Sequence, residues 1–253
     1  MLPSTPVSEI EFVPPQWKKR LSASDLKTAG DLVYFFPSRH EDFSQFRKIS
    51  ELEKDQVVTL EGIVEKIKTQ KTFRRKMLIT EALIADPSGK IKAVWFNFST
   101  PLKFLQPGRS LRLSGKISEN KKGEKFLQHP NFELITQWEK ITGSQEKATS
   151  TGRLAPVYSE SQKIPTYFLR RIIKQILPLF EPEEIIPQAI LDSQKLIPLS
   201  DALNWIHFPP SPEKLELAQK RMGFEKMFLV QLNALQIKKR SEERRVGKEF
   251  KSR

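Results

Sequence analysis

The chain has 253 residues, of which 38% are hydrophobic and 29% charged, an ordinary composition for a protein with one or two packed domains. It contains no cysteine, which excludes a disulfide scaffold and thiolate metal sites and favours a reducing cytoplasm. No apolar stretch of about 18 residues predicts a membrane span, and the acidic N-terminus lacks the pattern of a signal peptide.

The charge balance is strongly basic. Lysine and arginine number 43 against 30 acidic residues, which gives a net charge of +13. Between Lys54 and Lys125 alone, 16 basic residues face 7 acidic ones. An excess concentrated in this way favours a phosphate-rich partner such as nucleic acid, whereas a generally basic proteome is the alternative explanation.

Residues 1–50 predict an N-terminal segment of short helices. The Pro14-Pro15 pair marks either a turn or the start of a helix. Thr28 is an N-cap residue with Asp31 in the first turn of a second helix, which Pro37 ends.

Residues 51–138 predict five strands, because apolar and polar residues alternate along each run. A glycine inside the first run, Gly62, indicates a bend at a barrel corner. The runs are 58–64, 77–85, 91–95, 111–118 and 125–135, with turns at 86–89 and 120–123 and a short helix predicted at 100–105.

Three strands, a short helix and two strands follow one another in the order of an OB-fold, a five-stranded, partly open barrel. The predicted fold class is therefore α+β, with a barrel flanked by an N-terminal helical segment and C-terminal helices. A six-stranded barrel and a small sandwich are the alternatives.

The C-terminal part predicts a polar linker at residues 139–152 and helices over 153–240. A helix begins at Pro165 or Thr166, and a long one begins with Ser211 as N-cap and Pro212 at the first position. Residues 241–253 have almost no apolar content and resemble a translated sequencing-adapter read, so we expect them to lie outside the fold. We also expect a further domain to follow the long helix.

Catalytic motifs are missing from the sequence. None of the three Gly-Lys pairs belongs to a phosphate-binding P-loop, so ATP hydrolysis by this chain is not expected. His40, His129 and His207 lack metal-ligand spacing and are predicted to be structural. Glu41 and Asp42 predict a solvated turn.

The third strand carries the clearest binding signal. OB-fold barrels hold single strands by stacking bases on aromatic side chains while basic residues follow the phosphates. Alternation places Trp95 in the core and Phe96 on the opposite face, with Lys92 on that same face and Phe98 just beyond. Phe96 is therefore a candidate stacking residue. The alternative is that it packs under the predicted helix at 100–105.

Basic residues gather in two predicted loops. Lys71, Arg74 and Arg75 belong to a finger over residues 68–76, in the first barrel loop, which commonly touches nucleic acid in OB-folds. The alternative for this run is a merely solvated loop. Lys121, Lys122 and Lys125 form a weaker second patch.

From Val13 to Arg240 the chain resembles the N-terminal portion of the RecG family of bacterial ATP-dependent DNA helicases. The resemblance rests on eight motifs in the same order, any one of which is weak alone. They are Asp31-Leu32 with the run Phe36 to Asp42, Trp95-Phe96-Asn97, Gln106-Pro107-Gly108, His129-Pro130, Pro156-Val157-Tyr158, Ile206-His207-Phe208-Pro209, Ala218 to Arg221, and Phe224-Glu225.

The resemblance implies a wedge domain on the OB-fold that splits strands at stalled forks and Holliday junctions, in DNA repair and recombination, while a motor pulls the duplex. It implies that an aromatic ring at Phe96 stacks at the branch point. A second family aromatic is absent at Thr100, and Phe98 is the candidate substitute. The motor, with ATP and magnesium, would follow Arg240; no cofactor is expected in this fragment.

The implied partners are branched DNA, single-stranded DNA and a single-strand-binding protein, and the chain is expected to be a monomer. Two other classes stay open. One is a free-standing OB-fold binder of single-stranded nucleic acid without a motor. The other is an interaction module that uses the helix at 211–240, with the positive charge incidental.

Overall fold

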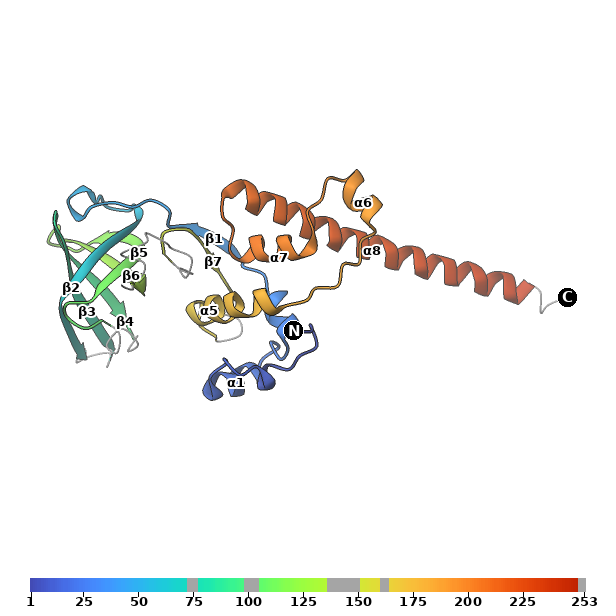
Figure 1. Ribbon diagram of the computed structural model, residues 1–253, viewed down its shortest axis with the longest axis horizontal. Helices are drawn as coiled ribbons and strands as arrows, with labels where there is room; N and C mark the ends of the chain where they lie inside the picture. The colour runs from blue at the N-terminus through green and yellow to red at the C-terminus, as the bar shows by residue number, and fades with distance from the viewer. Residues whose placement is uncertain (72–76, 98–104, 136–150, 160–163, 250–253) are drawn as a thin grey trace.

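The structure, a computed structural model, describes residues 1–71, 77–97, 105–135, 151–159 and 164–249, with side chains described as far as residue 239. Figure 1 shows a β-barrel beside a helical body, with a short two-stranded ribbon between them. The last helix, α8, extends away from both.

The barrel is closed and five-stranded, in the order β2-β3-β4-β6-β5. Only the β4–β6 pair is parallel, and the other four pairs are antiparallel. This arrangement confirms the predicted OB-fold and excludes the six-stranded alternative. The strands are β2 (Val57–Lys71), β3 (Leu78–Asp86), β4 (Gly89–Phe96), β5 (Ser110–Glu119) and β6 (Lys125–Leu134).

The barrel core comes from the predicted alternation. Val58, Leu60 and Trp95 are among the residues that point inward and are buried. Gly62 is required where β2 approaches β3, because a Cβ atom there would lie 2.6 Å from Cγ2 of Ile84 and 2.8 Å from the carbonyl oxygen of Ala85. The glycine that predicted a bend therefore lies where β2 and β3 approach each other closely.

The helical body packs the N-terminal segment against α5 and α7 in one apolar core, which includes Val7, Leu32, Leu169 and Leu203. The capping box at α2 forms as predicted: Thr28 Oγ1 accepts from the backbone N–H of Asp31, whose carboxylate accepts from the N–H of Thr28. The elements are η1 (Val7–Glu9), α1 (Pro15–Ser22), α2 (Ala29–Val33), α5 (Thr166–Ile176), η4 (Leu177–Leu179), α6 (Gln188–Ser193), α7 (Leu199–His207) and α8 (Pro212–Glu249).

Two strands lie where the sequence predicted none. The ribbon pairs β1 (Arg39–Asp42) with β7 (Leu154–Val157) in antiparallel register. The prediction of helices throughout residues 1–50 and from residue 153 was wrong here, as was the solvated turn at Glu41 and Asp42. Four-residue strands are too short to show a period, and their partners lie far apart in the sequence.

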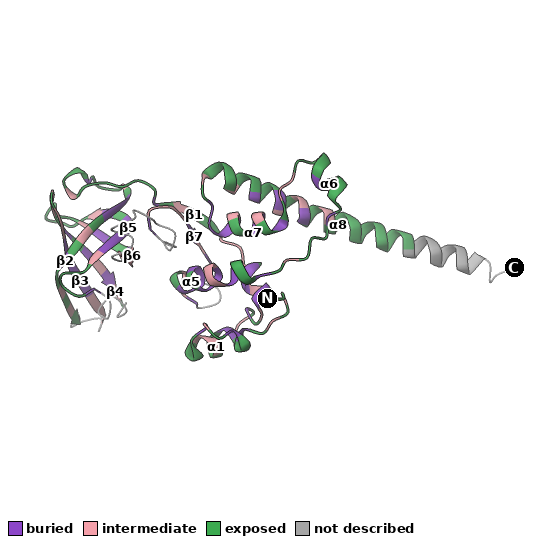
Figure 2. Ribbon diagram, viewed as in Figure 1, coloured by how far each residue is buried: buried purple, intermediate pink, exposed green. Residues whose placement is uncertain are grey.

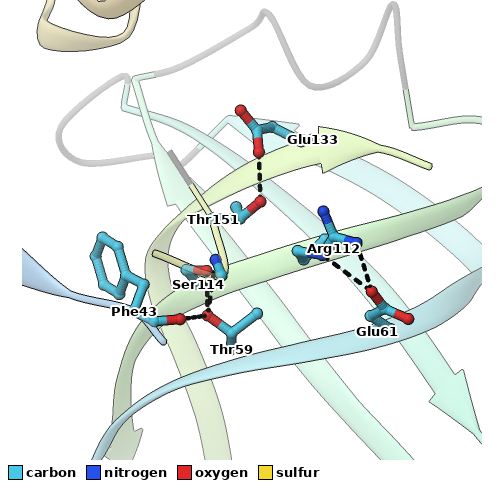
Figure 3. A network of polar contacts seen from close by, with 8 residues as sticks. Phe43, Thr59, Glu61, Arg112, Ser114, Glu133 and Thr151 are labelled. Atoms are coloured by element: carbon cyan, nitrogen blue, oxygen red, sulfur yellow. Dashed lines mark hydrogen bonds and ion pairs between the residues drawn. The ribbon is translucent and has the colours of Figure 1, made fainter. Parts of the chain in front are cut away.

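The connections to the ribbon also cover part of the barrel's outer surface (Figure 3). Thr59 and Ser114 point outward from β2 and β5, yet both are buried. The Thr59 hydroxyl donates to the Phe43 carbonyl at 2.6 Å and lies 2.5 Å from the Ser114 hydroxyl. The backbone N–H of Gly152 reaches the Thr59 oxygen at 3.4 Å.

Two further contacts complete this seam. Arg112 is nearly buried and donates two hydrogen bonds, of 2.9 and 2.7 Å, to one carboxylate oxygen of Glu61. The Thr151 hydroxyl donates to Glu133. The β2–β5 side of the barrel is thus covered by the chain's own segments.

The long helix exceeds its predicted length. Ser211 caps it and Pro212 opens it as predicted, but α8 continues to Glu249 instead of ending near Arg240. Glutamate, arginine and lysine are good helix formers and make up six of residues 241–249, which favours the continuation. Figure 2 shows that α8 becomes exposed away from the body. The predicted domain boundaries stay predictions.

Candidate nucleic-acid interface

Phe96 is the last residue of β4 and stands on the barrel's outer face. Its inward neighbour Trp95 is buried, whereas the Phe96 ring is half-buried. Phe96 pairs with Ile79 of β3 in the strand register. The ring is thus held at the end of a strand while part of it stays open to solvent.

His129 packs beside this ring. Its Nε2 accepts a hydrogen bond of 3.1 Å from the backbone N–H of Phe96, and the two ring centroids are 5.3 Å apart. Because Nε2 accepts, this arrangement requires the neutral imidazole, with its proton on Nδ1. Burial lowers the pKa of His129 below its ordinary value, which favours that neutral form.

An irregularity in β6 explains why His129 reaches Phe96. His129 has a φ of 47°, in the left-handed region, and the β5–β6 register shifts at this point. The next residue, Pro130, is buried, and its carbonyl accepts the indole N–H of Trp95 at 2.9 Å. Residues on both sides of the β4 end therefore fix the position of Phe96.

Lysines share this outer face with Phe96. Strand register places Lys66 and Lys68 of β2, and Lys90 and Lys92 of β4, on the same side of the sheet as Phe96. Lys90 pairs with Glu65 at 2.7 Å and Lys92 with Glu124 at 3.5 Å, both exposed. Exposed ion pairs contribute little stability, so these lysines can exchange their partners for phosphates.

The predicted residues lie toward two ends of this sheet. Lys71 ends β2 opposite Leu78, and Leu78 is hydrogen-bonded to Asn97, so Lys71 lies at the Phe96 end. Because Gln70 and not Lys71 is opposite Ile79, the register places Lys71 on the other face of the sheet from Phe96. Residues 68–71 belong to β2, so the predicted loop over 68–76 begins later than expected. Arg74, Arg75, Phe98 and Thr100 lie outside the described residues.

Lys92 stands four residues from Phe96, about 13 Å along the strand at the usual rise. Lys121 and Lys122 are exposed in the β5–β6 turn, beyond the Lys92 end of β4. In that turn Asn120 Oδ1 accepts from the backbone N–H groups of Lys122 and Glu124. The roles of all these residues in DNA binding stay predictions.

Sequence reasoning missed the contact between His129 and Phe96. It predicted all three histidines to be structural but named no partner for any of them. His207 is fully buried between the Tyr158 hydroxyl and the Val33 carbonyl, and His40 lies 2.9 Å from the Ile206 carbonyl. A proline directly after His129 inside a strand was the available signal, because proline marks irregular strand positions.

Groups of metal ligands and membrane-spanning helices were sought in the described part of the chain. Within the described ranges, no three His, Cys, Asp or Glu side chains lie close enough to hold a metal ion. In the same part of the chain, no helix has the length and apolar content needed to cross a bilayer.

The fold and this face define an OB-fold protein in which a half-buried aromatic ring and exposed lysine side chains lie along one sheet. The profile of the RecG wedge domain matches residues 7–180, and the chain belongs to this family.

Relatives support the same family. The chain is 28% identical to ATP-dependent DNA helicase RecG of Thermotoga maritima over 94% of its length, and 27% identical to that of Bacillus subtilis over 96%. A solved structure of RecG bound to a three-way DNA junction matches 95% of the chain with a TM-score of 0.68 and 27% identity. The chain spans about a third of the length of these proteins, from 30 to 34%.

Proposed function

We propose that this chain is the branched-DNA-binding wedge of a RecG-like ATP-dependent DNA helicase that acts at stalled replication forks and Holliday junctions. The observation that carries the proposal is the half-exposed Phe96 ring, fixed by His129 at the end of an outer face that also bears lysines. The family membership and the likeness to RecG on a DNA junction support it.

A base loses a stacking partner when the strands of a duplex separate. The last base pair before a branch exposes one stacking face to water. An aromatic ring replaces that lost partner, and such stacking contributes about 1–3 kcal/mol per base. Lysines on the same face neutralise the phosphates of the separated strands, a contribution that weakens as salt rises.

The proposal extends to the whole protein. There, a motor domain separate from the wedge would use ATP and magnesium, in the cytoplasm, with a single-strand-binding protein as a further partner. This chain, whose sequence has no P-loop, would bind branched and single-stranded DNA as a monomer and hydrolyse no ATP.

The test compares binding to a fork, a single strand and a duplex across a salt series. We expect the fork to bind most tightly. Phe96→Ala should reduce the ratio of fork to duplex affinity by about 5- to 150-fold and leave duplex binding unchanged. Phe46→Ala is the matched control, because Phe46 is an exposed aromatic residue lying over Arg112 on the covered side of the barrel.

Two outcomes would contradict the proposal. Equal affinity for the fork and the single strand, with Phe96→Ala without effect, would indicate a general OB-fold binder. Weak binding to all three DNAs with a shallow salt slope would indicate an interaction module instead.

A further inference from the structure

A pocket of about 440 Å³ lies at the end of β4 away from Phe96. One wall comes from β3 and β4 and a second from the β5–β6 turn. The third comes from the segment that contains η2 (Ile49–Glu51), which precedes the barrel in the chain. Its lining includes Ile49, Ser50, Leu83, Lys90, Lys92 and Lys125.

The third wall is fixed to the barrel by hydrogen bonds. The backbone N–H of Ile49 donates to Asp86 Oδ2 at 2.9 Å, and that of Ser50 to the Ser88 hydroxyl at 3.1 Å. From the opposite side, Lys125 Nζ donates to the Leu52 carbonyl at 2.6 Å. The pocket is therefore formed in the folded chain before any ligand arrives.

The chemistry of the lining suits a nucleotide. Ile49 and Leu83 supply apolar surface on which a base can lie. Three lysines line the pocket, and two of them are paired with acids, Lys90 with Glu65 and Lys92 with Glu124, so one positive charge is left over and favours an anion. A volume within about 300–1,000 Å³ is typical of small-ligand pockets.

The pocket lies in line with the proposed branch-point ring. Lys90 is six residues from Phe96 on β4, which corresponds to about 20 Å along the outer face. Lys92 and Val94 are the outward-facing residues between them. A strand leaving a base on Phe96 can thus follow β4 and reach the pocket after a few nucleotides.

We infer that this pocket binds a nucleotide of the single-stranded arm that leaves the branch point, and so acts as a second anchor beyond Phe96. This inference rests on the proposed function. It predicts that affinity depends on arm length, because only an arm long enough to reach the pocket can make the second contact.

The experiment measures affinity for forks whose single-stranded arm grows from about two to about sixteen nucleotides, the range of OB-fold site sizes. We expect the wild-type affinity to rise about five- to tenfold and then reach a plateau. Ser50→Trp fills the pocket and Ser50→Glu places a carboxylate in it. Both should remove the rise and keep the short-arm fork preference.

Ser44→Trp and Ser44→Glu are the matched controls, since Ser44 is an exposed serine that does not line the pocket. A rise that persists unchanged in both Ser50 variants, or a wild type with fork preference but no dependence on arm length, would overturn the inference and leave the proposed function standing. A wild type that shows no preference for a short-armed fork over duplex would overturn both this inference and the proposed function.

Discussion

The barrel and the helical body each have an apolar core, but they place their polar residues differently. In the body, Arg221 is fully buried and pairs with Glu184 at 2.7 Å and Glu225 at 2.6 Å. On the outer face of β4, Lys90 and Lys92 are exposed beside their acidic partners. A buried ion pair fixes the packing of the elements around it, whereas an exposed lysine can exchange its acidic partner for a phosphate of a ligand.

Arg170 connects the two regions. It lies on α5 and is nearly buried, and burial lowers the pKa of its guanidinium to about 10. Its Nε donates to the Pro156 carbonyl at 2.6 Å, and its Nη1 to Asn131 of β6 at 3.0 Å. The body thus holds the barrel through the ribbon and a buried arginine, and the proposed DNA-binding face stays on the barrel.

The largest effect is expected from breaking the buried ion pairs. Arg221→Ala leaves Glu184 and Glu225 without their cation in a largely buried site, which costs about 3–5 kcal/mol. We expect urea denaturation to show this loss, while the fork affinity of the folded variant stays within about twofold of wild type. If the variant is as stable as wild type, the buried ion pairs do not stabilise the helical body. If the folded variant loses fork preference, DNA binding is not confined to the barrel.

The second prediction concerns acid stability. Burial lowers the pKa of His207 to about 4, because the charged form has no access to water. The unfolded chain therefore takes up a proton as pH falls through about 6.5, before the folded chain does. The stabilisation from neutral His207 is complete above about pH 6.5 and is lost progressively down to about pH 4, by roughly 3 kcal/mol.

Urea denaturation of the wild type and His207→Gln at pH 7 and pH 4.5 measures this difference. The variant should be less stable at pH 7 and less sensitive to pH between the two points. Parallel pH profiles would show that His207 is not the group responsible.

The third prediction concerns the contact that fixes Phe96. His129→Asn preserves a residue that tolerates the left-handed conformation but removes the ring and its acceptor from the Phe96 N–H. Since one hydrogen bond contributes about 1 kcal/mol, fork preference should fall several-fold. Duplex affinity should change little, and the thermal midpoint should fall by about 2–4 °C because the same hydrogen bond is lost from the folded chain. An unchanged fork preference would mean that β4 alone positions the ring.

The smallest effect is expected at an exposed ion pair. Glu65→Gln removes the acid beside Lys90, and stability should change by less than about 1 kcal/mol because both side chains are exposed. Affinity for the single strand and for a fork with a long single-stranded arm should rise slightly and alike, since one more lysine becomes available to the phosphates of a single strand. A selective rise for the fork alone would place Lys90 at the branch point.

Much of the barrel could be predicted because its residues alternate. Leu111, Leu113 and Ile117 are buried as the pattern of β5 requires. Their outward neighbours Arg112 and Ser114 are buried too, and alternation could not predict this. The cover comes from segments near Phe43 and Thr151, which no local pattern connects to the strand.

The candidate site was predictable only in part, because local alternation does not report contacts between segments that are distant in sequence. Period-two alternation places Phe96 and Lys92 on one face, and the structure agrees. The partner of Phe96 is set by a backbone irregularity at His129, and a wall of the pocket by a segment outside the barrel. Both depend on contacts between elements distant in sequence.

The most direct test of the stacking claim is the fluorescence of 2-aminopurine placed at the branch-point base of a fork. Stacking on Phe96 should quench this fluorescence when the wild-type chain binds, and Phe96→Ala should bind without the quench. Equal quenching by the wild type and by the folded Phe96→Ala variant would contradict the claim that Phe96 replaces the stacking partner of the separated base.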